Sequence, residues 1–550
     1  MAATGATGEA PTLFLRKATG LVKGWNAFDA FIYAFMSVNL VTLGMYYSLS
    51  VLPFVPDGQV IPAIVLSAIG VSFLVVTYAG LIAAMPRAGG DYVWQSRVLS
   101  GGVAFVLSVT GWWFILWHWA PIYGNILTVQ ILQPLAALLG LHGLVDALVT
   151  KNGVFVVSLL TILLAGYLVS LGMEGYAKVQ KACFYLALVG LVVMFAIMLF
   201  GSRAGFERAF NQEAASLFGA SGNVYRETIR AAAEGNGISM KEVSLSPFFG
   251  PTLLLVPFML FWILYPNWGA TLYGEVRGAG DFRRVFNGMF WGLWITAAMS
   301  IVFVLLAAKT FGWEFFNAAN ANYWFAIYGS DVQPTIPLWP YPPLLASFYV
   351  HNRLFQILMV LVFGAWFVGW AGTLFLSSTR VIFAAAFDRI LPEWAANVSE
   401  RRHVPTGALL LMFVPSIVIS ALYAYWSQFV TYTLDATLVI AVTYLGSAVA
   451  ATILPWRRPG IYENSAVSRY RIGGVPLISV AGFLTVLFLG WAIYKWLFDE
   501  LYGIGVGNPA SLVYLGILYG IALVIYVVAR IVRRQQGIDL SRIYQEIPVE

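Results

Sequence analysis

Long, continuous hydrophobic runs alternate with short polar segments along most of the chain. A helix that crosses a hydrocarbon core of about 30 Å needs roughly 20 apolar residues. Apolar residues follow one another in these runs without alternating with polar ones, so the pattern excludes the strands of a transmembrane β-barrel. The pattern therefore predicts an all-α polytopic membrane protein with about twelve transmembrane helices, at 27–50, 60–84, 102–136, 153–172, 178–201, 250–273, 286–308, 354–384, 407–425, 429–453, 474–497 and 510–532.

The composition favours a protein that uses lipid as its solvent. Hydrophobic residues make up 60% of the 550 residues and charged residues 10%, whereas about 25% of the residues in a soluble domain are charged. The single cysteine, Cys183, excludes a disulfide within the chain, and the four histidines lack metal-ligand spacing. The sequence has neither a phosphate-binding loop nor a cluster of intramembrane acids and histidines, so it predicts neither an ATP-driven pump nor an enzyme. We expect no cofactor and no nucleic-acid partner.

Basic residues are distributed unequally between alternate loops. Most of the 31 lysines and arginines fall into the tails and loops of one face, and an excess of positive charge marks cytoplasmic loops. This bias predicts a multi-pass protein of the cytoplasmic membrane with both termini in the cytoplasm, which requires an even number of spans. The predicted segments are a cytoplasmic tail (1–24), a first set of five spans (25–201), a long extracytoplasmic loop (202–249), a second set of five spans (250–453), spans eleven and twelve (454–532) and a second cytoplasmic tail (533–550).

Two outer segments, 202–249 and 309–353, are long for connections between spans. The first is predicted to contain a surface helix near 223–234, where acidic and basic residues are mixed. Each segment is expected either to pack as a cap over the outer mouth or to act as an outer gate. The sequence leaves both roles open.

Two of the predicted spans contain helix-breaking residues at membrane depth. Irregular backbone is tolerated there only where it lines a cavity or is buried in protein. The breaks fall in spans one and six, the first members of the two sets of five, which is typical of inverted repeats around a binding site. The alternative is a simple proline kink and small-residue helix packing. The substrate-binding residues predicted at the two breaks are Ser37, Asn39, Val41, Thr42, Gly44, Tyr265, Pro266 and Asn267.

Broken helices can bind a zwitterion through their backbone. The N-terminus of a half-helix carries partial positive charge and free N–H groups, which suit a carboxylate. The C-terminus exposes carbonyl groups, which suit an ammonium group or a cation. The breaks therefore favour a small solute that carries an amine.

Three motifs resemble those of the amino acid–polyamine–organocation (APC) superfamily of transporters. They are Pro86-Arg87-Ala88-Gly89-Gly90-Asp91-Tyr92 after span two, Glu275-Val276-Arg277 after span six, and the stretch from Ser378 to Pro392 after span eight. The resemblance implies a LeuT-type fold, with two inverted five-helix repeats and two additional C-terminal helices, and alternating access around a site between spans one and six. It also implies coupling or gating roles at the inner end for Arg87, Glu275, Arg380 and Asp388.

The chain departs from the family pattern in the spans themselves. The stretch from Leu40 to Gly44 keeps only part of the glycine run that relatives carry in span one, and Tyr265-Pro266-Asn267 replaces their G-[FY]-[DE] in span six. No lysine stands midway along the predicted fifth span, where proton-coupled relatives often have one.

Aromatic residues of span three are further candidates. Trp113 and Trp117 are four residues apart and are expected to share a helix face, which can attract an ammonium group or simply pack in the core. His118 can relay protons or hydrogen-bond to a neighbouring helix. Trp366 of span eight is a further candidate for the substrate site.

Oxygen-bearing side chains give two more hypotheses. The hydroxyl groups of Ser377 and Ser378 in span eight can ligate sodium together with carbonyls of the first break, or can bond to their own backbone one turn earlier. Asp435, in span ten, is predicted to bind the substrate amine or a coupling proton; the alternative is a water-exposed position near the outer interface.

The combined features predict a secondary active transporter that moves amino acids or related small amine-bearing solutes through the lipid bilayer by alternating access, with H+ or Na+ as the coupling ion. The alternatives are a transporter of another solute class, such as nucleobases, organic cations or anions, and a non-transporting membrane sensor on the same fold.

Overall fold

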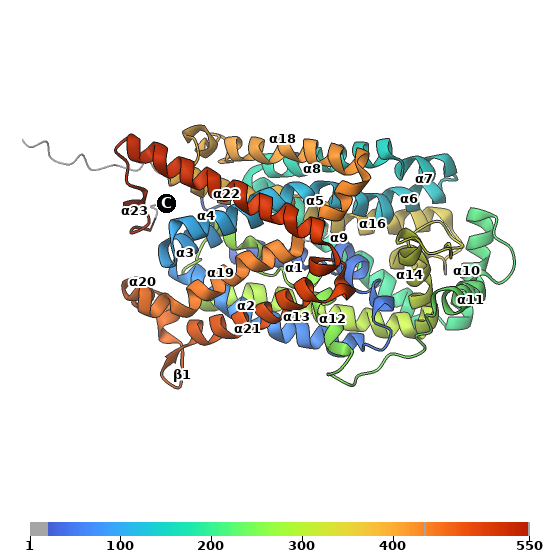
Figure 1. Cartoon of the computed structure of the whole chain (residues 1–550). Coiled ribbons are helices and arrows are strands. Elements are labelled where there is room, and N and C mark those ends of the chain that lie inside the picture. Colours follow the sequence, from blue (N-terminus) through green and yellow to red (C-terminus); the bar gives the residue numbers. More distant parts are fainter. Residues whose placement is uncertain (1–19, 434–435, 548–550) are drawn as a thin grey trace, which may run out of the picture.

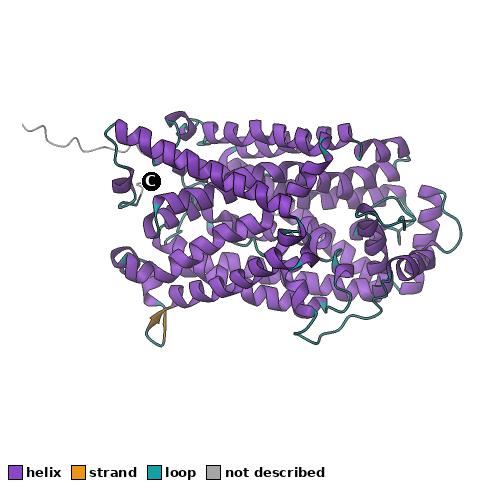
Figure 2. Ribbon diagram, in the orientation of Figure 1, coloured by secondary structure: helices purple, strands orange, loops and turns teal. Residues whose placement is uncertain are grey.

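The structure is a computed structural model that describes residues 20–433 and 436–547. It is a bundle of long helices that run roughly along one direction (Figure 1). In the described part of the chain, the strands β1 (Arg471–Ile472) and β2 (Val475–Pro476) form one antiparallel hairpin, and helices and loops make up the rest (Figure 2).

Within the described residues, twelve segments are long and apolar enough to cross a membrane. Span one consists of α1 (Ala27–Val38) and η1 (Leu40–Ser48), and span two is α2 (Val60–Ala84). Span three consists of α4 (Gly101–Val109), η3 (Thr110–Phe114), α5 (Ile115–Leu127), η4 (Thr128–Leu132) and α6 (Gln133–Leu138). Span four is α8 (Lys151–Ser170), span five is α9 (Gly172–Phe200), and span six consists of α12 (Thr252–Ile263) and η5 (Trp268–Glu275). Span seven consists of α13 (Phe282–Ala307), η6 (Ala308–Gly312) and α14 (Trp313–Ile327), and span eight of α16 (Arg353–Ala371) and α17 (Thr373–Phe387). Span nine is α18 (Thr406–Tyr425), and span ten consists of η8 (Ser427–Thr433) and α19 (Ala436–Arg457). Span eleven is α21 (Leu477–Phe498), and span twelve is α22 (Pro509–Gln535).

Short helices lie between and after the spans. They are α3 (Asp91–Val98), α7 (His142–Leu148), α10 (Arg203–Phe218), α11 (Val224–Asn236), α15 (Pro342–Ser347), α20 (Pro459–Glu463) and α23 (Leu540–Ile543). In Figure 1, α3, α20 and α23 lie at one end of the bundle, which we call the α3 end, and α10, α11 and α14 lie at the other, which we call the α10 end.

The predicted all-α polytopic class and the number of spans are confirmed, but two boundaries were wrong. Span five begins at Gly172 rather than at residue 178, so Lys178 and Lys181 lie inside the helix. Span seven continues through the π-helical turn η6 into α14, so the first part of the predicted 309–353 loop is helical. The run of apolar and aromatic residues weakens there, but the helix continues because α14 buries its aromatic side chains against α11.

The two broken spans run antiparallel to each other. The first half of span one, α1, contacts the second half of span six, η5, and the second half of span one, η1, packs along α12. This arrangement brings the two breaks together inside the bundle. It is also the arrangement that inverted repeats require of their first members.

The segment predicted as a long outer loop folds into two helices, and α11 coincides with the surface helix expected near 223–234. The Tyr225 ring of α11 stacks on Phe315 of α14 with 4.4 Å between the ring centroids. Trp324 of α14 and Trp339 both contact Tyr46 at the end of η1. The segments therefore cover span one at the α10 end.

Candidate functional site

Asn39 makes the break in span one. Its backbone is left-handed (φ 43°), a conformation that asparagine adopts more readily than most residues. The Oδ1 atom accepts a hydrogen bond from the Thr42 N–H at 2.9 Å and so caps η1. The Nδ2 group donates to the Trp366 carbonyl of α16 at 3.2 Å. One side chain thus starts the second half-helix and ties the break to span eight.

Pro266 and its neighbours make the break in span six. Helix α12 ends at Ile263 and η5 begins at Trp268, and Pro266 lacks the N–H that would continue the helix. Asn267 is fully buried, and neither polar atom of its amide has a hydrogen-bond partner among the described residues, although the Tyr444 hydroxyl of α19 lies beside it. The Thr42 hydroxyl of the other break is also buried, and it too lacks a hydrogen-bond partner in the described part of the chain.

Aromatic rings surround the second break. The Trp268 indole lies against Trp112 of span three, with 4.6 Å between ring centroids, and stacks on Trp119 at 5.4 Å. Tyr265 packs edge-on against Trp268 and Trp119, and its hydroxyl bonds to Thr437 of α19 at 3.0 Å. Spans three, six and ten therefore meet at this point.

Trp113 and Trp117 share a helix face, as their spacing predicts, and their ring centroids lie 5.8 Å apart. Their indole N–H groups both donate to the Leu411 carbonyl of α18, at 3.3 and 3.1 Å. The tryptophans of span three that contact Trp268 beside the second break are Trp112 and Trp119.

His118 also points away from the two breaks. Its Nε2 atom lies 2.5 Å from the Tyr514 hydroxyl of α22, and its Nδ1 atom lies 3.0 Å from the Phe114 carbonyl. The structure thus gives this buried histidine the second of its two expected roles, a hydrogen bond to a neighbouring helix.

The remaining predicted residues of span one contribute mainly to packing. Ser37 donates to the Tyr33 carbonyl of its own helix at 2.7 Å, and Val41 is buried in the core. Gly44 lies against the Trp262 ring, where a Cβ atom would come within 3.1 Å of the indole.

Two predicted site residues belong to other spans. The Trp366 ring of span eight packs against Phe35, with 5.6 Å between the ring centroids. Asp435 lies outside the described residues.

The oxygen atoms proposed for sodium are already engaged. The Ser377 hydroxyl donates to the Trp268 carbonyl at 2.9 Å and bonds to the Tyr33 hydroxyl at 3.0 Å. Ser378 donates to the Leu374 carbonyl of its own helix at 3.1 Å. The Gly369 carbonyl of span eight accepts from both Tyr176 and Gln180 of α9. Each of these groups thus has a hydrogen-bond partner among the described residues, and sodium ligation by Ser377 and Ser378 stays a prediction.

Two buried ion pairs tie elements together at the α3 end. Arg380 of α17 forms a bidentate pair with Glu275 of η5, at 2.7 and 3.0 Å. Arg97 of α3 pairs with Asp388, just after α17, at 2.5 and 2.9 Å. Three of the four predicted gating residues thus meet there, whereas Arg87 donates to the adjacent Pro86 carbonyl. Arg97 was missed because no predicted motif included it.

A further ion pair links spans one and five. Lys181 Nζ lies 2.6 Å from the Asp29 carboxylate of α1. The predicted start of span five at residue 178 concealed this contact, since it placed Lys181 at the mouth of the span.

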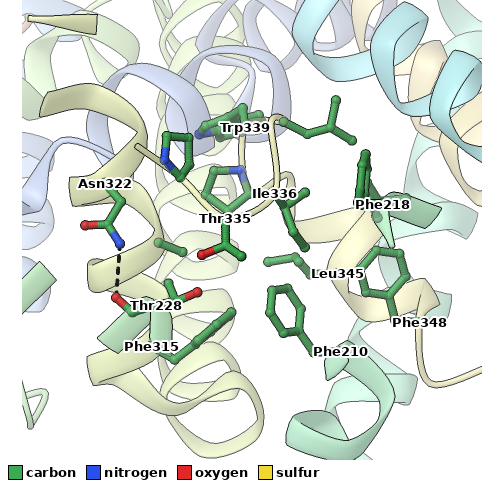
Figure 3. Close-up of a pocket in the computed structure, with 15 residues that line it drawn as sticks. Phe210, Phe218, Thr228, Phe315, Asn322, Thr335, Ile336, Trp339, Leu345 and Phe348 are labelled. Carbon is green, nitrogen blue, oxygen red and sulfur yellow. Dashed lines mark hydrogen bonds between the residues drawn. The ribbon is translucent and has the colours of Figure 1, made fainter. Parts of the chain in front are cut away.

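One cavity, of about 40 Å³, lies at the α10 end between the segments 202–249 and 309–353, which we together call the cap. Figure 3 shows Phe210, Phe315, Trp339 and Phe348 around it. Its lining is mostly aromatic and aliphatic and comes from the cap, including α14, and not from the two breaks. The cavity therefore belongs to the packing of the cap.

The antiparallel pair of broken helices, enclosed by further apolar spans, defines a multi-pass membrane transporter. A family model described as amino acid permease matches residues 28–523. The chain therefore belongs to the amino acid permease family, within the APC superfamily that its motifs resemble. A comparison with curated proteins gave no match.

Proposed function

We propose that the protein is a secondary active transporter that moves amino acids or related small amine-bearing solutes across the cytoplasmic membrane by alternating access. One observation carries the proposal: the two helix breaks lie together and hold Asn267 and Thr42, whose buried side-chain polar atoms have no hydrogen-bond partner among the residues that the structure describes. Buried polar groups are normally satisfied. A bound polar solute is what would satisfy them.

The backbone supplies the charge complementarity for a zwitterion. The first N–H groups of a helix have no partner within it; Asn39 caps the N–H of Thr42, which leaves those of Leu40 and Val41 for a carboxylate. The last carbonyls of α12 face the same region with partial negative charge and suit an ammonium group. Trp268 and Tyr265 add ring faces that attract a cation.

The ion pairs at the α3 end suit an inner gate. Opening that end requires Arg380 and Glu275, or Arg97 and Asp388, to separate or to move together. Separating a buried pair is costly because each charge is left without compensation. We propose that this end faces the cytoplasm, as the distribution of lysines and arginines predicts, and that both termini lie on that side.

A second candidate substrate class is a nucleobase. The amide of Asn267 offers a donor and an acceptor side by side, and the neighbouring rings of Tyr265 and Trp268 offer faces on which a planar solute can stack. A planar heteroaromatic solute matches both features.

Thermal stabilisation of the purified protein separates these classes. A panel of amino acids, amines and nucleobases is added at rising concentrations, because a ligand that binds the folded state raises the melting temperature by mass action. We expect stabilisation by an amine-bearing solute, which Thr42→Val weakens. Thr161→Val is the matched control, since the buried Thr161 of α8 bonds to its own helix. Stabilisation by nucleobases alone would contradict the amine assignment.

A further inference from the structure

The Pro86–Tyr92 segment holds a buried carboxylate that the gating ion pairs do not use. Asp91 is the first residue of α3, outside the candidate spans, and its side chain is fully buried. Gly89 and Gly90 both have positive φ, and a Cβ atom on Gly90 would come within 3.0 Å of the Ala270 and Thr271 backbone. The glycines thus allow this turn to pack directly on η5 and to carry Asp91 into the interior.

Three helices supply hydrogen-bond donors to the Asp91 carboxylate. The Trp112 indole N–H of span three donates to Oδ2 at 3.0 Å. The Ser447 hydroxyl of α19 donates to Oδ1 at 2.6 Å, and the Tyr78 hydroxyl of α2 donates to the same oxygen. All three donors are neutral. The carboxylate is therefore solvated by the protein without a balancing charge.

The neighbouring charged groups are committed to other partners. Arg97 and Tyr92, on Asp91's own helix, both bind Asp388. From α17 and η5, Arg380 pairs with Glu275. The titratable side chain of α19 near Asp91 is Tyr444, whose ring centroid lies 5.4 Å from that of Tyr78. The titratable side chain of α2 near Asp91 is Tyr78, which already donates to the carboxylate. Among the described residues, none forms an ion pair with Asp91.

Burial without a cation favours the neutral acid. Desolvation raises the pKa of Asp91 from 3.8 to about 6, against the opposing effect of the hydrogen bonds from Ser447, Tyr78 and Trp112. A buried carboxyl group that titrates near neutrality can bind and release a proton during each transport cycle.

We propose that Asp91 is the proton-binding site through which this transporter is coupled to the proton gradient. The inference rests on the transport function proposed above. One proton binds a carboxylate oxygen of Asp91 and converts it to a neutral carboxylic acid, whose O–H donates to a neighbouring hydroxyl. The same proton leaves to water when the carboxylate forms again.

The geometry indicates how this proton is linked to the substrate site. Asp91 holds α2, span three and α19 together through its three hydrogen bonds. Because burial raises its pKa, the protonated acid stabilises this closed arrangement, and release of the proton lowers the cost of opening and hydrating the α3 end. Trp112, one of the three donors, also lies against Trp268 beside the second break. Proton binding and substrate binding therefore both act on the contact between Trp112 and Trp268.

The site can be tested without any substrate. Difference infrared spectroscopy of the purified protein, titrated between about pH 5 and about pH 8, follows the carbonyl band of protonated carboxylic acids. We expect a band with a midpoint near pH 6 that is lost in Asp91→Asn. The matched control Glu213→Gln removes a buried carboxylate that pairs with Arg353 at 3.2 Å in the cap and should leave the band in place. Absence of the band in the wild type, or its persistence in Asp91→Asn, would overturn the assignment.

Transport assays in proteoliposomes then test the coupling. With a pH gradient of one unit, one-to-one coupling supports about tenfold accumulation of substrate. We expect Asp91→Asn to retain exchange of labelled for unlabelled substrate but to accumulate none above equilibrium, whereas Glu213→Gln accumulates like the wild type. Accumulation driven by the pH gradient in Asp91→Asn would contradict the proposal. A wild type that shows the infrared band but exchanges no solute would contradict the transport function instead and leave the proton site standing.

Discussion

At the scale of single residues, Asn39 shows how one side chain can build a binding site. Its left-handed backbone ends α1. Its side-chain oxygen Oδ1 caps η1, and its side-chain Nδ2 group donates to the Trp366 carbonyl of span eight. Here the cap takes up the Thr42 N–H and leaves only Leu40 and Val41 to bind an anion.

Replacing Asn39 separates these contributions. Asn39→Ala loses the cap, at about 1 kcal/mol, and leaves alanine in a left-handed backbone that alanine tolerates less well than asparagine. Asn39→Gly loses the hydrogen bonds but avoids the backbone strain. We expect both variants to melt below the wild type, and the alanine variant to melt lower. Equal melting temperatures for the two variants would show that the left-handed conformation is not maintained.

Asp91 gives a second prediction at this scale, for stability. Its folded-state pKa is raised to about 6, so the stability gained from the protonated acid is present below the unfolded pKa of about 3.9 and is lost as the pH rises through about 6. The loss is at most about 3 kcal/mol, because one pKa unit corresponds to about 1.4 kcal/mol. Asp91→Asn carries no such titration.

Melting curves of the two proteins at several pH values check this sign. The melting temperature of Asp91→Asn minus that of the wild type should become more positive between about pH 4 and about pH 7. A difference that stays constant, or that falls with rising pH, would mean that the buried carboxylate is not destabilised by its charge.

At the scale of helices, hydrophobic runs predicted the spans well because lipid demands nearly continuous apolar sequence. They did not predict which face of span three lies beside the breaks. Trp113 and Trp117 share a face that bonds to α18, whereas Trp112 and Trp119 contact Trp268. A helix that is apolar on every side carries no periodic signal that distinguishes its faces. Hydrophobic runs also carry no information on which helices are neighbours, so the contact between Asp91 and Ser447 could not be predicted.

The ion pair between η5 and α17 gives a prediction at this scale. Glu275→Gln leaves the buried Arg380 without its partner, and we expect a loss of about 3–5 kcal/mol. The double variant Glu275→Gln/Arg380→Met removes both charges and should recover much of that loss. Chemical or thermal unfolding of the three proteins measures the difference. If the double variant is less stable than Glu275→Gln, the pair contributes more than mutual charge compensation.

At the scale of the whole molecule, two closures surround the paired breaks. Ion pairs join α3, η5 and α17 at one end, and α10, α11 and α14 cover η1 at the other. The sequence motifs named Glu275, Arg380 and Asp388, which the structure places in these ion pairs, and their gating role stays a prediction. The second was predicted only as two long segments and one helix, because the packing of the cap depends on aromatic contacts such as Tyr225 with Phe315.

The central claim is that the two breaks bind the solute that the protein transports. Counterflow in proteoliposomes tests it most directly: vesicles loaded with an unlabelled amino acid or amine are diluted into a trace of the same labelled solute. We predict uptake by the wild type and by Thr161→Val, and at least about a tenfold loss of apparent affinity in Asn267→Ala, since one buried hydrogen bond is worth about 1.5 kcal/mol or more to a charged partner. Equal uptake kinetics for Asn267→Ala and Thr161→Val would contradict the claim and place the solute elsewhere in the bundle.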